Sequence, residues 1–153
     1  MSSRRPPQLS KSRFTAGLQC LKRLYLECYH RDLADPVVPS QQAIFDSGTA
    51  VGEIARQRFP QGRLINEQYF EHAQALRSTQ HLLADTSVPA LYEAAFTFES
   101  IRTRVDILCR NNHQGFDLVE VKSSTSLKRE HIADAAIQLY VLEGSGIPVS
   151  RVY

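Results

Sequence analysis

The sequence predicts an α/β fold with a mixed central sheet flanked by helices, and the order of its segments is the basis of that prediction. Three segments, 90–98, 101–109 and 116–122, are rich in β-branched and large apolar residues and are separated by turn residues, which is typical of an antiparallel meander. A helical pattern over about 127–143 separates this meander from a last extended segment, 149–153. Such a crossover helix allows the last strand to join the sheet in parallel.

Three more helices are predicted before the meander. Ser10 or Ser12 can cap a helix that runs to about residue 29. Its apolar stripe consists of Phe14, Leu18, Leu21, Tyr25 and Cys28. A second helix spans 41–59, where Gly48 and Gly52 predict close packing against another backbone. A short strand at 63–68 and a helix over 71–84 follow.

The 153 residues fit one domain, which we expect to span 10–153 behind a flexible basic tail at 1–9. The chain stops inside a predicted strand, so we expect the native protein or its relatives to continue. No apolar run approaches the roughly 20 residues of a membrane span, and the N-terminus lacks the apolar part of a signal peptide. Cys20, Cys28 and Cys109 form no CxxC pair, which indicates neither a disulfide framework nor a zinc site. These features favour a cytoplasmic protein with no membrane partner, and they do not indicate its oligomeric state.

The hairpin over 104–122 is the first candidate for a functional site. If it is symmetric about His113, Asp106 lies opposite Glu120 and Arg104 lies opposite Lys122. The other face is then purely apolar and consists of Val105, Ile107, Val119 and Val121. Like charges directly opposite each other destabilise a sheet, so the facing carboxylates require a reason.

A divalent cation, Mg²⁺ or Mn²⁺, would explain the facing carboxylates, because their oxygens can bind it and its charge cancels their mutual repulsion. Arg104 and Lys122 could instead neutralise the two acids diagonally. A bulge that shifts the register by one residue would remove the alignment altogether. The hairpin alone leaves these alternatives open.

The N-terminal segment is strongly basic. Between Met1 and Arg31, seven Lys and Arg residues stand against Glu27 alone, and three aromatic residues lie among them. Such a segment suits a nucleic acid, because cations bind the phosphate backbone and aromatic rings stack on bases. The candidates are Lys11, Arg13, Lys22 and Arg23. A solvated helix face with a basic tail explains the same charges.

Asp106 and the run Glu120-Val121-Lys122 resemble the D…(D/E)xK signature of the PD-(D/E)XK nuclease superfamily. Longer segments extend the resemblance over nearly the whole chain, and these are LSKSRFTAGLQCLKRLYLE, FDSGTAVGEIARQRFP, YEAAFTFESIRTRVDIL, FDLVEVKSST and AAIQLYVLEGSGIPVSRVY. Together they are similar to the RecB-like branch, close to a bacterial family of unnamed function and more distantly to CRISPR-associated RecB-like exonucleases.

The resemblance implies a restriction-endonuclease-like αβββαβ core and metal-dependent hydrolysis of DNA phosphodiester bonds. The metal ligands that it implies for Mg²⁺ or Mn²⁺ are Glu53, Asp106, Glu120 and Val121, the last through its carbonyl. Lys122 would orient or activate the attacking water. Gln138, which matches the first position of a QxxxY motif, would hold the lysine, the water or the DNA. A surface carboxylate is the alternative for Glu53, and a salt-bridge partner is the alternative for Lys122.

Some positions depart from the family pattern. Gly52 and Arg56 stand where RecB-like nucleases often carry His and Glu, and Leu142 stands where the QxxxY motif has Tyr. Tyr140 lies about 200° around the helix from Gln138, so we expect it to pack elsewhere.

Two residues outside the basic segment complete the nucleic-acid candidates: Arg104 on the hairpin, and His131, which shares a helix face with Gln138. Relatives with an iron–sulfur cluster use a Cys at the position of Cys20 and three later ones. No later triplet exists here, so we predict no cluster and expect Cys20 to pack in the core. The alternatives to a nuclease are a catalytically inactive nucleic-acid-binding module and a protein-interaction domain with purely structural carboxylates.

Overall fold

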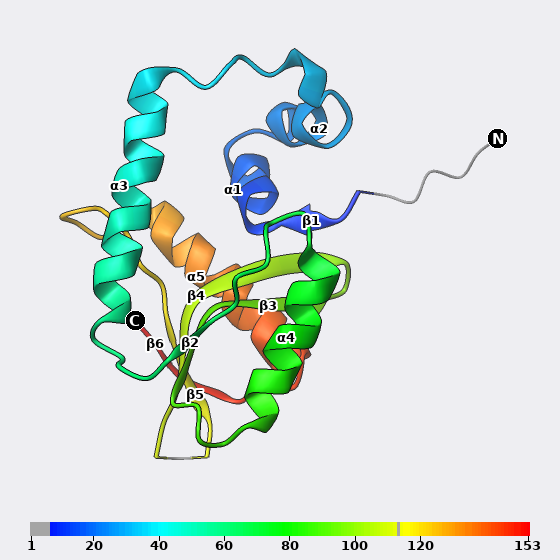
Figure 1. Cartoon of the computed structure of the whole chain (residues 1–153). Coiled ribbons are helices and arrows are strands. Elements are labelled where there is room, and N and C mark those ends of the chain that lie inside the picture. Colours follow the sequence, from blue (N-terminus) through cyan, green and yellow to red (C-terminus); the bar gives the residue numbers. More distant parts are fainter. Residues whose placement is uncertain (1–6, 113) are drawn as a thin grey trace.

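The protein is described here from a computed structural model that covers residues 7–112 and 114–153. In chain order its elements are β1 (Leu9–Ser10), α1 (Lys11–Gln19), α2 (Leu21–Tyr29), the 3-10 turn η1 (Arg31–Leu33), α3 (Pro39–Arg56), β2 (Arg63–Leu64), α4 (His72–Ala84), β3 (Ala90–Phe98), β4 (Ile101–Arg110), β5 (Phe116–Val119), α5 (Arg129–Gly144) and β6 (Val149–Val152). Figure 1 shows how these helices surround a central sheet.

The sheet has six strands in the order β2-β3-β4-β5-β6, with β1 beside β4. Strands β3, β4 and β5 form the antiparallel meander, and β6 joins β5 in parallel after the crossover helix α5. The short strands β1 and β2 also pair in parallel, with β4 and β3 respectively. The predicted α/β class with a mixed sheet flanked by helices is therefore confirmed.

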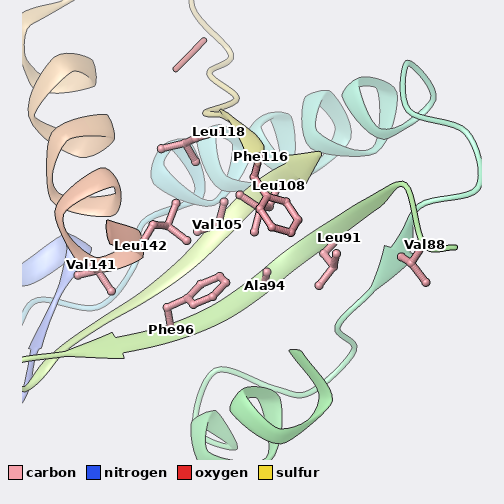
Figure 2. Packing of buried hydrophobic residues seen from close by; sticks show 10 residues of the cluster. All are labelled: Val88, Leu91, Ala94, Phe96, Val105, Leu108, Phe116, Leu118, Val141 and Leu142. Atoms are coloured by element: carbon pink, nitrogen blue, oxygen red, sulfur yellow. The ribbon is translucent and has the colours of Figure 1, made fainter. Parts of the chain in front are cut away.

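The main core lies between the meander and α5. Its members are Val88, Leu91, Ala94, Phe96, Val105, Leu108, Phe116, Leu118, Val141 and Leu142, shown in Figure 2. On β3, Ala94 and Phe96 belong to this core, whereas Ala95 packs with Ala75 of α4. Successive strand residues point to opposite faces, so α4 and α5 cover opposite faces of the sheet.

The N-terminal helix differs from its prediction. Ser10 is its cap, with Oγ accepting from the Arg13 amide at 3.3 Å, but the helix breaks at Cys20, whose φ of −162° and ψ of 120° are extended. The predicted apolar stripe is consequently split between α1 and α2, and Leu21 is 77% exposed. Cys20 is exposed rather than packed in the core.

The chain before α1 also differs from the expected tail. Leu9 pairs with Ile101 in β1, so the fold begins before residue 10. The rest of the predicted basic tail, residues 1–6, lies outside the described residues.

Helix α3 stands apart from the core over most of its length (Figure 1). Ile44, near the start of the helix, is 65% exposed. Towards the end of α3, Ala55 packs against an apolar cluster formed by Ala90, Tyr92 and Ile107. The predicted close packing at Gly48 and Gly52 is wrong, since a Cβ at either position would meet no atom within 4 Å. In the described part of the chain, no helix is both long and apolar enough to cross a lipid bilayer.

Candidate active site

The two strands of the β4–β5 hairpin have the predicted register. Ile107 pairs with Val119 and Arg110 with Phe116, which are the partners that symmetry about residue 113 requires. The ladder ends at Val119, and the next two amides find other acceptors. The Glu120 amide donates to the Tyr153 carbonyl at 2.9 Å, and the Val121 amide donates to Asp106 Oδ2 at 2.7 Å. A carboxylate thus takes the place of a backbone acceptor where the strands separate.

A backbone irregularity lies at the same level of the sheet. Glu93 on β3 has a φ of 54°, in the left-handed region, and the ladder between β3 and β4 skips it and its expected partner Asp106. In a regular strand, residues three positions apart point to opposite faces of the sheet. Because of this interruption, Leu91 and Ala94 both face the core under α5. Non-glycine residues in this region cost on the order of 1 kcal/mol or more and are found frequently at functional sites.

The interruption also corrects the predicted apolar face of the hairpin. Val105 packs with Leu108 in the core under α5. Ile107, Val119 and Val121 belong instead to a separate cluster with Ala90 and Tyr92. The alternation of β4 changes at Asp106, so the four residues expected on one face lie on two.

Glu120 is an enclosed acid of the site, with 4% of its side chain exposed. Its Oε1 accepts from the ammonium groups of Lys11 at 2.9 Å and Lys122 at 2.7 Å, and its Oε2 accepts from Gln138 Nε2 at 2.5 Å. Burial favours a raised pKa for this carboxyl, but Lys11, Gln138 and Lys122 outweigh it and lower the pKa below its ordinary value. Glu120 is therefore an ionised carboxylate at neutral pH.

Asp106 behaves in the opposite way. Burial, and then the charge of Glu120, raise its pKa from 3.8 to about 6, although Lys11 and the Val121 amide act in the other direction. Arg104 does not take part in the diagonal neutralisation of the two acids, because its guanidinium donates to the carbonyls of Ile65 and Glu67, each at 3.1 Å. Lys122 does pair with Glu120, but Glu120 lies two residues before it along the chain and not diagonally across the hairpin.

Asp134 on α5 is a site residue that the sequence did not single out. Its Oδ2 lies 2.5 Å from Lys122 Nζ, and its Oδ1 accepts from the Thr15 hydroxyl at 2.9 Å. Burial tends to lower the pKa of Lys122, but Asp134 and Glu120 raise it above its ordinary value. Lys122 is therefore held as an ammonium ion. Asp134 lies one turn before Gln138 on α5, and that spacing was the signal that it shares the site.

A cleft of about 500 Å³ opens over these groups between α3 and the strands. It is lined by Lys11, Arg56, Glu93, Asp106, Glu120, Val121 and Lys122, and by the α3 residues Gly48, Thr49 and Gly52. The two glycines present no side chain here, which keeps this wall of the cleft open. Val121 borders the cleft and contributes its amide to Asp106.

Glu53 does not join the other predicted ligands. It is exposed and is not part of the cleft wall, whereas Arg56, three residues later, is. The acid that does line the cleft besides Asp106 and Glu120 is Glu93, whose Oε1 lies 3.0 Å from Arg56 Nη2. A lone carboxylate inside the apolar run of β3 was the available signal for Glu93 in the sequence.

Among the predicted nucleic-acid residues, only Lys11 reaches this cleft. Arg13 donates to the carbonyls of Gln8 and Glu27, at 2.8 and 3.3 Å, and links α2 to the residue before β1. Arg23 pairs with Glu27, and Lys22 is exposed beside it. His131 Nδ1 accepts from the Lys128 amide at 3.2 Å, so it caps α5. Tyr140 packs away from the site as expected, against Phe98 and Glu99.

Within the described residues, no group of three or more His, Cys, Asp and Glu side chains is arranged to hold a metal ion. Comparison of the chain with protein-family models, curated proteins and solved structures found no match. The site itself brings together the carboxylates of Asp106, Glu120 and Asp134, two ammonium groups and a buried amide.

Proposed function

We propose that this protein is a metal-dependent nuclease that hydrolyses DNA phosphodiester bonds, with a restriction-endonuclease-like core of the PD-(D/E)XK type. The observation that carries the proposal is that Asp106, Glu120 and Lys122 line one cleft, while the buried Gln138 of α5 donates to Glu120. Each of the four was selected from the sequence for a role in this chemistry.

Asp106 and Glu120 suit Mg²⁺ or Mn²⁺. Mg²⁺ is commonly bound by one or two carboxylates together with water and substrate phosphate oxygens, so a third acid is not required. The raised pKa of Asp106 reflects an uncompensated buried charge beside Glu120, and a cation would compensate it. The amide oxygen of Gln138 is a further hard acceptor, buried and without a hydrogen-bond partner in the described part of the chain.

A bound divalent cation would polarise the scissile phosphate and lower the pKa of a bound water. Lys122 stays protonated because Glu120 and Asp134 hold its ammonium group, so it acts as a fixed positive charge rather than as a base. Placed at the cleft, that charge stabilises the negative charge that develops on the phosphate in the transition state. Gln138 fixes the second oxygen of Glu120, and Lys11 adds positive charge from α1.

The direct test is cleavage of single-stranded and double-stranded oligonucleotides with Mg²⁺ or Mn²⁺, with EDTA as the metal-free control. We expect cleavage by the wild type and its loss in Asp106→Ala and Lys122→Ala. Lys128→Ala is the matched control, because the Lys128 side chain is 57% exposed and outside the cleft. Cleavage that survives unchanged in both site variants would reject the assignment.

A nucleic-acid-binding module without catalysis is the second candidate. The observation in its favour is that two ammonium groups already saturate Glu120 Oε1, as expected for a neutralised cluster. This candidate predicts steeply salt-dependent DNA binding and no turnover with any divalent metal. Turnover that depends on Asp106 would exclude it.

A further inference from the structure

A second cleft, of about 630 Å³, continues from the first along β4. The two share Lys11, Thr49, Arg56, Glu93 and Asp106, so they form one groove. The new part lies between β4, the start of α1 and the segment that joins β2 to α4. Its volume is within the range of pockets that enclose small organic ligands, which leaves room for a nucleotide.

Two arginines give this part of the groove its charge. Arg102 and Arg104 both line it, and each has a buried guanidinium nitrogen, Nε and Nη1 respectively, without a hydrogen-bond partner among the described residues. Glu67 also lines the groove, but it bonds to Ser78, and Glu93 pairs with Arg56. In the part of the chain that the structure describes, no carboxylate lies within ion-pair distance of Arg102, so its charge is available to an anion.

His72 lies at the wall of this part of the groove, close to both arginines. Burial first, and then the charges of Arg102 and Arg104, lower its pKa. Its Nε2 lies 2.8 Å from the Thr97 hydroxyl, which fixes the ring at the groove wall. Arg102 and Arg104 therefore supply the positive charge of the part of the groove beyond Lys11 and Arg56.

An exposed aromatic ring borders the same arginine. Tyr69 is 60% exposed, and Arg102 Cζ lies 5.9 Å from the centre of its ring. The next residue, Phe70, is 83% exposed. Guanidinium groups that follow a phosphate backbone, beside aromatic rings on which bases stack, are typical of single-stranded nucleic-acid binding. A duplex keeps its bases stacked inside and cannot use such a ring.

We propose that this second cleft binds the single-stranded DNA that flanks the scissile phosphate, with Arg102 on a backbone phosphate and Tyr69 stacked on an unpaired base. The proposal rests on the proposed function, because the shared residues place the flanking strand next to Asp106 and Glu120. It goes further by assigning the substrate as a single strand and by naming the residues that select it.

The test measures binding of a fluorescein-labelled single-stranded oligonucleotide by anisotropy, in EDTA so that no cleavage occurs. We expect Arg102→Gln and Tyr69→Ala each to weaken binding about tenfold. Arg102→Gln should also lower the slope of log K against log salt by about 1, because one phosphate contact is lost. Tyr69→Phe should bind like the wild type, and Arg77→Gln, an exposed arginine of α4 outside the groove, is the matched control.

The outcomes separate this inference from the nuclease assignment. If the wild type cleaves DNA but Arg102→Gln and Tyr69→Ala bind single strands as the wild type does, the groove proposal is wrong and the nuclease stands. If the wild type binds but never cleaves, and both variants weaken binding, the groove stands and the nuclease is wrong. An equal loss of duplex binding in Tyr69→Ala would overturn the selection for single strands. Tyr69 is exposed, so its variants test the proposal even if Arg102→Gln does not fold.

Discussion

The two halves of the hairpin over 104–122 differ in what satisfies their backbone. In the turn-proximal half, from Ile107 to Val119, cross-strand pairs continue without interruption, and Leu108 and Leu118 are both 0% exposed. In the open half, beyond Val119, the amide of Val121 turns to the carboxylate of Asp106. The turn-proximal half is held by backbone pairs between the strands. The open half lacks such pairs and contains the charged groups Asp106, Glu120 and Lys122.

The comparison shows how a stable sheet can carry an unfavourable cluster. Burying Asp106 beside Glu120 raises the pKa of Asp106 to about 6, and Glu93 opposite it adopts a φ of 54°. Both features lower the free energy of unfolding, and burial of apolar side chains in the adjoining core offsets that loss. Groups that are kept at a cost are expected to contribute to function rather than to stability.

The largest expected effect is in the packed half. Leu108→Ala removes a fully buried side chain from the core under α5 and should lower the free energy of unfolding by about 2–5 kcal/mol. Val121→Ala, in the open half and only partly buried, should cost about 1 kcal/mol. Urea denaturation of the two variants measures the difference, and equal losses would remove the distinction between the halves.

The next effect is on activity in the open half. Lys122→Met removes the charge that we propose faces the scissile phosphate and should lower the single-turnover rate constant of cleavage by about 100-fold or more. Single-turnover cleavage, at a temperature where the variant is folded by circular dichroism, measures it. Lys128→Met should retain full activity. A Lys122→Met protein that is less stable but equally active would reduce Lys122 to a salt-bridge partner.

Asp106 should make stability depend on pH. Its pKa is about 6 in the folded protein and 3.8 ordinarily, so between these values the folded state binds a proton more tightly than the unfolded chain. This contribution is complete below about pH 4 and is lost as the pH rises to about 6, by up to about 3 kcal/mol. Asp106→Asn should remove that loss and be more stable than the wild type at neutral pH.

Urea denaturation in EDTA across this pH range provides the measurement. Asp117→Asn is the matched control from the packed half, where Asp117 accepts from the Asn111 side chain at 2.7 Å. That variant should gain no stability at neutral pH. An Asp106→Asn protein whose stability follows the wild-type pH profile would show that Asp106 is not buried at a cost.

The smallest effect concerns the backbone at Glu93. Glu93→Ala and Glu93→Gly both remove the pair with Arg56, but only glycine relieves the left-handed φ. The glycine variant should therefore be more stable than the alanine variant by about 1 kcal/mol. Thermal unfolding of the two proteins compares them directly, and a more stable alanine variant would mean that the backbone at Glu93 is not strained.

The register from Ile107 and Val119 to the turn could be predicted because a symmetric hairpin fixes its partners from the turn alone. The break at Cys20 could not, since the apolar period of the first helix continues through it. Glu93 was missed because no local propensity places a glutamate at positive φ. Glu53 was selected by resemblance, and the way α3 stands away from the sheet leaves it exposed.

The central claim is that Asp106 and Glu120 together hold a divalent cation. Anomalous diffraction from a crystal soaked in Mn²⁺ tests it most directly. We expect a manganese peak between the two carboxylates, with Lys11 and Lys122 displaced from Glu120 Oε1 and Lys122 still bound to Asp134. A map at saturating Mn²⁺ with no peak there, and with both lysines still at 2.9 and 2.7 Å from Glu120, would contradict it.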